Sequence, residues 1–220
     1  MTIKGATFDI GGVLYTDDVF KRAVKSALIE LGAKVSDEIF EKVYSDHLES
    51  QSGSLRTKLC QEFLGSLDKK SELLKVTDKY WKFDSSDMYQ EVKAELLKLR
   101  EAGILLGIIA NQPVTVAETL KKDGLYDLFK FMGISALVGI EKPKPELYEL
   151  AIRELGLPAE EIVHVGNRID NDVKPAKALG MKTVWVMRGE ANPNPTADDL
   201  KVADLSVIDL TGIAELIINL

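Results

Sequence analysis

The sequence has few of the features that mark secreted, membrane or nucleic-acid-binding proteins. Cys60 is the only cysteine, so no disulfide can form within the chain, as is usual in a reducing compartment. No stretch approaches the ~20 apolar residues that a membrane span needs, and residues 1–10 lack the apolar core of a signal peptide. A net charge of −7 argues against binding to nucleic acid or an anionic membrane. These absences predict a cytoplasmic protein without nucleic-acid or membrane partners.

The remaining composition is that of a globular α/β protein. Hydrophobic residues make up 45% of the 220 positions and charged residues 29%, enough for a sizeable core. Strand-like apolar runs recur at 3–10, 103–110, 133–139, 161–166, 182–187 and 204–209. Amphipathic helical patterns, such as 113–124 and 145–156, separate most of them. This alternation predicts a Rossmann-like parallel sheet with helices on both faces.

A helical segment interrupts this alternation between residues 16 and 87. Its pattern predicts four consecutive helices, at 17–31, 36–51, 54–64 and 68–82. The predicted organisation is therefore a discontinuous α/β core of residues 1–15 and 88–220, with residues 16–87 inserted as an all-α cap over a site.

Polar residues follow four of the predicted strands. Asp9 ends the first strand, and the other three lead into 110–112, 141–145 and 166–172. Because ligands of open parallel sheets bind outside the carboxyl ends of the strands, these loops predict one shared site.

The four loops carry the motifs "DIGGVL" (9–14), "IIANQ" (108–112), "GIEKPKPELY" (139–148) and "VGNRIDNDVKPAKALGM" (165–181). Their order and content resemble the haloacid dehalogenase-like hydrolase superfamily, and the likeness extends over the whole chain. The helical insertion lies where this family places a cap, between its first and second motifs.

The resemblance implies a chemistry and a set of residues. Asp9 would be the nucleophile that forms an aspartyl-phosphate, assisted by the charge of Lys142. It implies Mg²⁺ held by Asp9, the carbonyl of Gly11 and Asp172. Groups that would contact a small phosphorylated substrate are Gly12, Ala110, Asn111 and Lys142, with Asn167, Asp170 and Arg56 as further candidates for the site.

Three positions differ from the phosphatases of this family. Gly11 replaces the aspartate that protonates the leaving group, a function worth ~10²–10⁴ in rate. Ala110 replaces a phosphate-binding hydroxyl, and Asn167 replaces an acid of the metal loop.

Three hypotheses about function follow. The first is a slow or selective Mg²⁺-dependent phosphatase. The second is a metal-independent 2-haloacid dehalogenase, because a halide leaves without a proton; Asn167, Asp170 and Tyr148 also suit that branch. The third is a binding or regulatory protein that has lost turnover. We expect a monomer or homodimer, structural roles for both histidines and both tryptophans, and a loop at 188–199.

Overall fold

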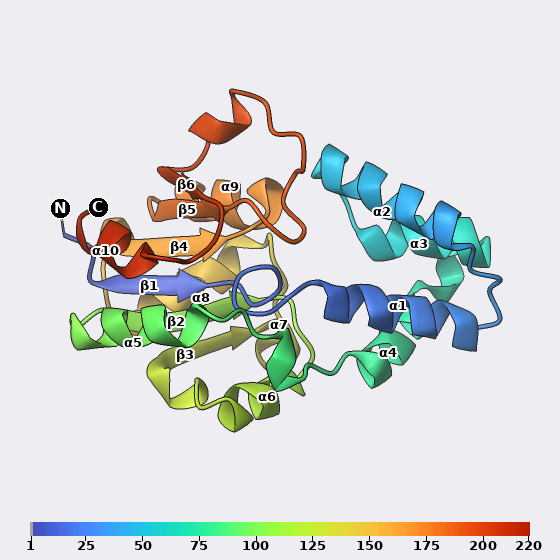
Figure 1. Ribbon diagram of the computed structural model, residues 1–220, viewed down its shortest axis with the longest axis horizontal. Helices are drawn as coiled ribbons and strands as arrows, with labels where there is room; N and C mark the ends of the chain where they lie inside the picture. Colours follow the sequence, from blue (N-terminus) through green and yellow to red (C-terminus); the bar gives the residue numbers. More distant parts are fainter. Residues whose placement is uncertain (1) are drawn as a thin grey trace.

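The computed structural model describes residues 2–220, and its centre is a six-stranded sheet in which all strands are parallel (Figure 1). The strand order is β3-β2-β1-β4-β5-β6. The strands are β1 (Gly5–Phe8), β2 (Leu105–Ala110), β3 (Phe129–Ile134), β4 (Ile162–Gly166), β5 (Lys182–Val186) and β6 (Leu205–Val207). Since β1 lies between β2 and β4, the order changes direction beside β1, where sheets of this kind bind ligands.

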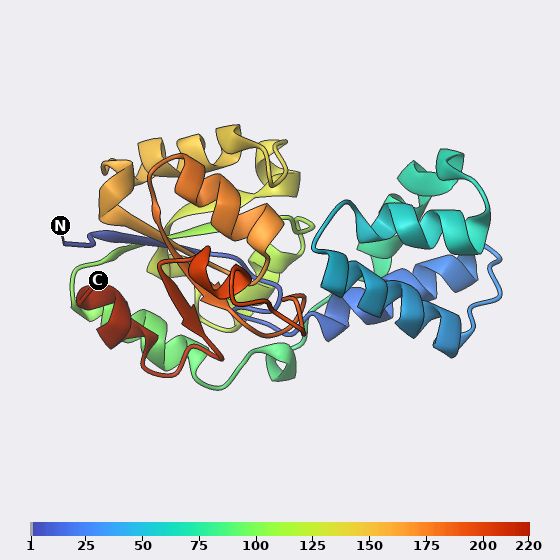
Figure 2. The same cartoon turned by 90° about the horizontal axis from the view of Figure 1, so that it is seen from above.

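Helices cover both faces of the sheet (Figure 2). Buried side chains of α5 (Val92–Glu101), α6 (Val116–Lys122) and α10 (Ile213–Ile218) join one apolar cluster with β1 and β2. On the other face, α8 (Pro145–Leu155) and α9 (Lys174–Ala178) pack in a second cluster. The strands are therefore buried on both sides, as their nearly continuous apolar sequences predict.

The segment after β1 forms four helices that share a core of their own. They are α1 (Asp18–Glu30), α2 (Asp37–Ser50), α3 (Leu55–Leu64) and α4 (Lys70–Tyr80), close to the predicted ranges. Their buried residues, such as Phe40, Leu59 and Leu73, form a cluster apart from those around the sheet. We call α1–α4 the helical block. It faces the carboxyl ends of the strands, toward which the arrows of Figure 1 point.

Local signals explain where the helices begin and end. Ser36 accepts a hydrogen bond from the Ile39 amide at the start of α2, and Pro145 opens α8. Gly156 ends α8 in a left-handed conformation. Pro113, predicted in a helical first turn, lies in a turn just before α6.

The prediction for the third strand was wrong by several residues. The strand is Phe129–Ile134, and most of the segment predicted as strand (133–139) forms the short helix α7 (Ser135–Val138). Phe129 and Phe131 are buried while Lys130 is exposed, the alternation of an edge strand. The apolar run after it ends at Gly139, whose positive φ of 73° closes a helical turn.

Short helical turns complete the chain, at Leu67–Lys69, Ser85–Asp87, Tyr126–Leu128, Ala159–Glu161 and Asp199–Lys201, together with a π-turn at Ile169–Val173. Every helix within residues 2–220 is too short or too polar to cross a membrane. The cytoplasmic location and the predicted domain limits stay predictions. Met1, where the predicted core domain begins, lies outside the described residues.

Candidate active site

The first element of the site is an ion pair between Asp9 and Lys142. Asp9 directly follows β1, and its amide donates to the carbonyl of Val165 in β4, 2.9 Å away. This bond holds the carboxylate at the point where the strand order reverses. Lys142 Nζ lies 2.8 Å from Asp9 Oδ1, and only 8% of Asp9 and 7% of Lys142 is exposed.

A second carboxylate lies behind the lysine. Asp172 is fully buried, and its Oδ1 is 2.7 Å from Lys142 Nζ and 3.3 Å from His164 Nε2. The backbone amide of Arg168 donates to its Oδ2 at 2.9 Å. Both oxygens of Asp172 therefore already have protein donors, and its main contact with the site is the lysine that it positions.

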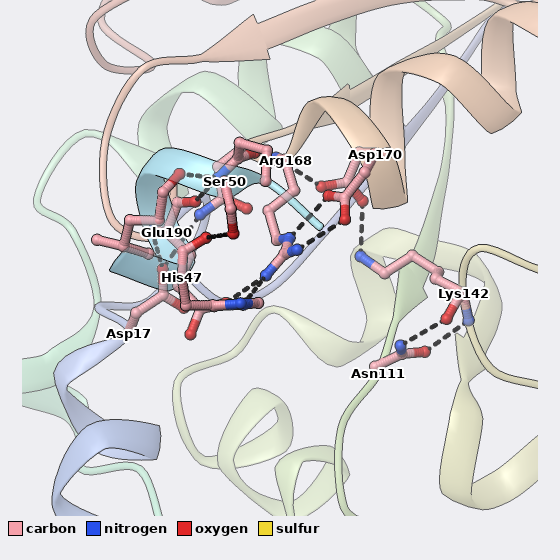
Figure 3. A network of polar contacts seen from close by, with 12 residues as sticks. Asp17, His47, Ser50, Asn111, Lys142, Arg168, Asp170 and Glu190 are labelled. Carbon is pink, nitrogen blue, oxygen red and sulfur yellow. Dashed lines mark hydrogen bonds and ion pairs between the residues drawn. The ribbon is translucent and has the colours of Figure 1, made fainter. Parts of the chain in front are cut away.

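The loop after β2 fixes the lysine from the other side (Figure 3). The Asn111 side chain donates to the Lys142 carbonyl (3.1 Å) and accepts from the Lys142 amide (2.8 Å). Asn111 thus pairs with both backbone groups of Lys142, as a neighbouring strand would in a sheet. This pairing predicts that Asn111 orients the lysine loop, in addition to any contact with phosphate.

Arg168 connects the site to the helical block. Its guanidinium donates to both carboxylate oxygens of Asp170 (2.9 and 2.7 Å) and to His47 Nε2 in α2 (2.6 Å). Glu190 Oε2 lies 3.5 Å from the same guanidinium. Figure 3 shows these groups converging between the core and α2. Burial and the charge of Arg168 lower the pKa of His47 to about 3, so His47 accepts from Arg168 as a neutral base.

A cavity of about 360 Å³ opens between the sheet edge and the helical block. Asp9, Gly11 and Lys142 line it from the core, while Arg56 of α3 and Trp81, which follows α4, line it from the opposite side. More acids than bases face it: the acidic lining residues are Asp9, Asp17, Glu141, Asp170 and Glu190, and the basic ones are Arg56, Lys142 and Arg168. This excess of negative charge suits a site that binds a cation together with an anionic substrate.

Burial dominates the titration of the site. It raises the pKa of Asp9 to about 6, although the charge of Lys142 opposes the rise. Burial also acts to raise the pKa of Asp172, but Lys142 and His164 outweigh it and hold that pKa below its ordinary value. The pKa of Asp17 is raised by burial and then by the neighbouring charges of Glu190 and Asp9.

The predicted site residues are brought together to different degrees. Those that line the cavity are Asp9, Gly11, Arg56, Asn111, Lys142, Asn167 and Asp170. Gly12, Ala110 and Asp172 are buried beside it and are not among the lining residues within 2–220. The Gly12 amide donates to the Tyr15 carbonyl at 2.7 Å. The phosphate contacts of Gly12 and Ala110 and the metal contact of Asp172 therefore stay predictions from the resemblance.

Several lining residues were not singled out as functional from the sequence. His47 and Trp81 were expected to be structural, yet both face the cavity, as does Glu190 from the predicted loop 188–199. Asp17 was assigned no role at all. No spacing rule could find Asp17, because only the fold returns it to the vicinity of Gly11.

The donors fit Mg²⁺ better than a metal that is fully enclosed by protein. No group of three or more His, Cys, Asp or Glu side chains within residues 2–220 could hold a metal by itself. Mg²⁺ keeps several waters and binds through one or two carboxylates plus substrate phosphate oxygens. The Asp9 carboxylate, with Gly11 and Asn167 facing the same cavity, meets that requirement.

A carboxylate paired with a buried lysine at the switch point of a parallel sheet, beneath a helical block, defines an α/β enzyme with a carboxylate-based site. Residues 3–180 match the family model of haloacid dehalogenase-like hydrolases. The chain belongs to this family and is a hydrolase.

Two relatives agree with this assignment, and a solved structure shares the fold. The chain is 30% identical to the glyceraldehyde 3-phosphate phosphatase of Methanocaldococcus jannaschii, over 99% of this chain and 98% of the relative. It is also 30% identical to the enzyme of the same name from Methanopyrus kandleri, over 93% of each chain. The crystal structure of a predicted phosphoglycolate phosphatase from Haemophilus somnus shares the fold, with a TM-score of 0.77 over 98% of both chains at 20% identity.

Proposed function

We propose that the protein is a phosphatase that hydrolyses a small phosphomonoester, with Asp9 as the nucleophile. The observation that carries the proposal is the Asp9–Lys142 pair at the floor of the cavity, 2.8 Å from Oδ1 to Nζ. Because Lys142 contacts Oδ1, the other carboxylate oxygen of Asp9 would make the attack. The names of the two relatives, both phosphatases, support the same reaction class.

The residues suggest two half-reactions. In the first, a carboxylate oxygen of Asp9 forms a bond to phosphorus while the bond to the alcohol oxygen breaks, leaving an aspartyl-phosphate. In the second, water attacks that phosphorus and the bond to Asp9 breaks, releasing inorganic phosphate. Lys142 offsets the negative charge of Asp9 and of the transferring group throughout. Asp172 holds the lysine in place from behind, 2.7 Å from Nζ.

The proposed cofactor is Mg²⁺. Asp9 and the Gly11 carbonyl would hold it, with Asn167 contributing in place of an acid, while Asp172 would position Lys142. When bound, the ion would neutralise phosphate charge and align the group for transfer. The acidic surplus of the cavity, with five acidic and three basic side chains, is consistent with this need for a cation.

The helical block would act as the cap that selects the substrate. Arg56 lines the cavity from α3, stacked 5.1 Å from the Phe20 ring and 5.3 Å from the Trp81 ring, and it has no ion pair within residues 2–220. A half-buried guanidinium without an ion-pair partner favours a ligand with a second acidic or polar group. A cavity of about 360 Å³ suits a small metabolite, in keeping with the three-carbon substrate in the relatives' name.

The test is phosphate release from 2,4-dinitrophenyl phosphate with and without Mg²⁺, by the wild type and Asp9→Asn. We expect Mg²⁺-dependent turnover that the substitution reduces by at least ~10³-fold. Release of chloride from 2-chloropropionate in the presence of a chelator, without phosphatase activity, would show a dehalogenase instead. Failure to turn over either compound would contradict both enzymatic hypotheses.

A further inference from the structure

The missing side chain at position 11 leaves a space that a residue from the start of the helical block fills. An ideal Cβ built on Gly11 would lie 2.4 Å from Asp17 Oδ1, far inside contact distance. A Cβ on Gly12 or Gly189 would lie 2.5 or 2.2 Å from Asp17 Oδ2. Three glycines from two loops thus enclose one carboxyl group. Any side chain at these positions would displace it.

The two oxygens of Asp17 have different surroundings. Oδ2 accepts from the Glu190 amide (2.7 Å) and from Asn167 Nδ2 (3.1 Å), which fixes the direction of the carboxyl group. Oδ1 has no hydrogen-bond donor among residues 2–220 and is the oxygen next to Gly11. Asp17 and Asp9 line the same cavity. The unpartnered oxygen is therefore the one beside the missing side chain.

The orientation of Asp17 is not explained by helix capping. Asp17 is the N-cap residue of α1, where an aspartate ordinarily accepts from an amide of the first turn and contributes about 1 kcal/mol. Here the side chain makes no capping hydrogen bond and turns away from its own helix toward Gly11. The carboxyl group therefore lies in the cavity and makes no hydrogen bond to the first turn of α1.

We propose that Asp17 supplies the catalytic carboxyl group that position 11 lacks, an inference that rests on the proposed phosphatase function. As Asp9 bonds to phosphorus and the ester bond breaks, the proton on Asp17 passes to the leaving alcohol oxygen. Asp17 is then a carboxylate. It takes a proton from the water that attacks the aspartyl-phosphate, and this single transfer returns Asp17 to its protonated form as phosphate is released. The net reaction consumes one ester and one water and gives one alcohol and one phosphate.

The test compares two esters that differ in their need for a proton. Phenyl phosphate has a poor leaving group that needs protonation, whereas the dinitrophenolate of 2,4-dinitrophenyl phosphate leaves without it. For Asp17→Asn we expect kcat/KM on phenyl phosphate to fall by ~10²–10⁴, and on the dinitrophenyl ester by less than ~10-fold. The matched control is Asp18→Asn, which alters an exposed neighbour and should change neither rate.

A relocation experiment provides the second arm. Gly11→Asp combined with Asp17→Ser moves the carboxyl group to position 11 and removes the atoms that would clash with it. We expect this double variant to hydrolyse phenyl phosphate at least ~10-fold faster than Asp17→Ser alone. Circular dichroism verifies that each variant is folded.

The outcomes separate the two proposals. An equal loss on both esters in Asp17→Asn would mean that the residue only holds the site, or a cation, in place, and would overturn the inference while the phosphatase proposal stands. Unchanged rates on both esters would overturn it as well. If wild type hydrolyses neither ester while Asp9→Asn is equally inactive, the phosphatase proposal fails first.

Discussion

Replacing Lys142 by methionine tests the electrostatic centre of the site most directly. Lys142 Nζ lies 2.8 Å from Asp9 and 2.7 Å from Asp172, and all three side chains are almost completely buried. Methionine keeps much of the volume and removes the charge. Two carboxylates then remain in a low-dielectric interior without the cation that both of them contact.

The expected loss follows from the cost of an unpaired buried charge. Removing one partner of a buried ion pair costs ~3–5 kcal/mol of unfolding free energy, and we expect a value in this range at about pH 7.5. The pKa of Asp9 is about 6 with the lysine present, against 3.8 as its ordinary value. Without the lysine, the pKa of folded Asp9 rises further, so the folded state binds the proton more tightly than the unfolded state.

This difference fixes the sign of the pH dependence. A raised carboxyl pKa gives stability that is present below the unfolded value and is lost as pH rises through the folded value. Lowering the pH from about 7.5 to about 5 should therefore restore stability to Lys142→Met more than to wild type. Because a tenfold difference in proton affinity is worth ~1.4 kcal/mol, the gap in unfolding free energy between the two proteins should narrow by about 2 kcal/mol.

The assay is urea denaturation at both pH values, with chelator present so that no cation compensates. Lys144→Met is the matched control, because Lys144 lies in the same loop, is exposed and forms no ion pair among residues 2–220. Equal stability of Lys142→Met and wild type at the higher pH would refute the account. So would a gap that does not change with pH.

Two further predictions concern ligands of the cavity. Mg²⁺ should raise the melting temperature of wild type at about pH 7.5, by the equivalent of ~1–3 kcal/mol at 10–100 times its Kd, and an equal rise in Asp9→Asn would contradict the cation site. Arg56→Met should raise KM for a phosphomonoester with a second acidic group about tenfold while leaving KM for an aryl phosphate nearly unchanged. Lys58→Met is the control, since Lys58 reaches Ser50 at 2.9 Å and is not among the lining residues.

Most of the fold could be predicted because apolar strand runs and amphipathic helical patterns alternate along most of the sequence. Five of the six strands lie in or close to their predicted runs, and the four helices of the block match within about two residues at most ends. The exception, β3, lies at the sheet edge, where its alternating residues 129–132 carry a weaker apolar signal than the run 133–139. Apolar content alone cannot distinguish an edge strand from a short buried helix.

The predicted residues that line the cavity lie in the motif loops, with Arg56 of α3 as the exception. Asp9, Lys142 and Asn111 were found because each directly follows a strand or a marked loop. The hydrogen bond between Arg168 and His47 was not predicted. It joins residues 121 positions apart and depends on how the helical block sits against the sheet. Burial creates the low pKa of His47, and burial is a tertiary property.

Gly11 illustrates the difference between a motif and a site. The resemblance to the family implied that the glycine replaces an acid, with a loss of up to ~10⁴ in rate. In the structure, the loss of that side chain is what admits Asp17, since the two could not occupy the space together at 2.4 Å. Gly12 and Gly189 impose the same restriction on the other oxygen. A substitution at position 11 alone should therefore not restore the family pattern. Asp17 has to be replaced by a smaller residue before an aspartate at position 11 can fit. The two positions therefore constrain each other, because their side chains would occupy the same volume.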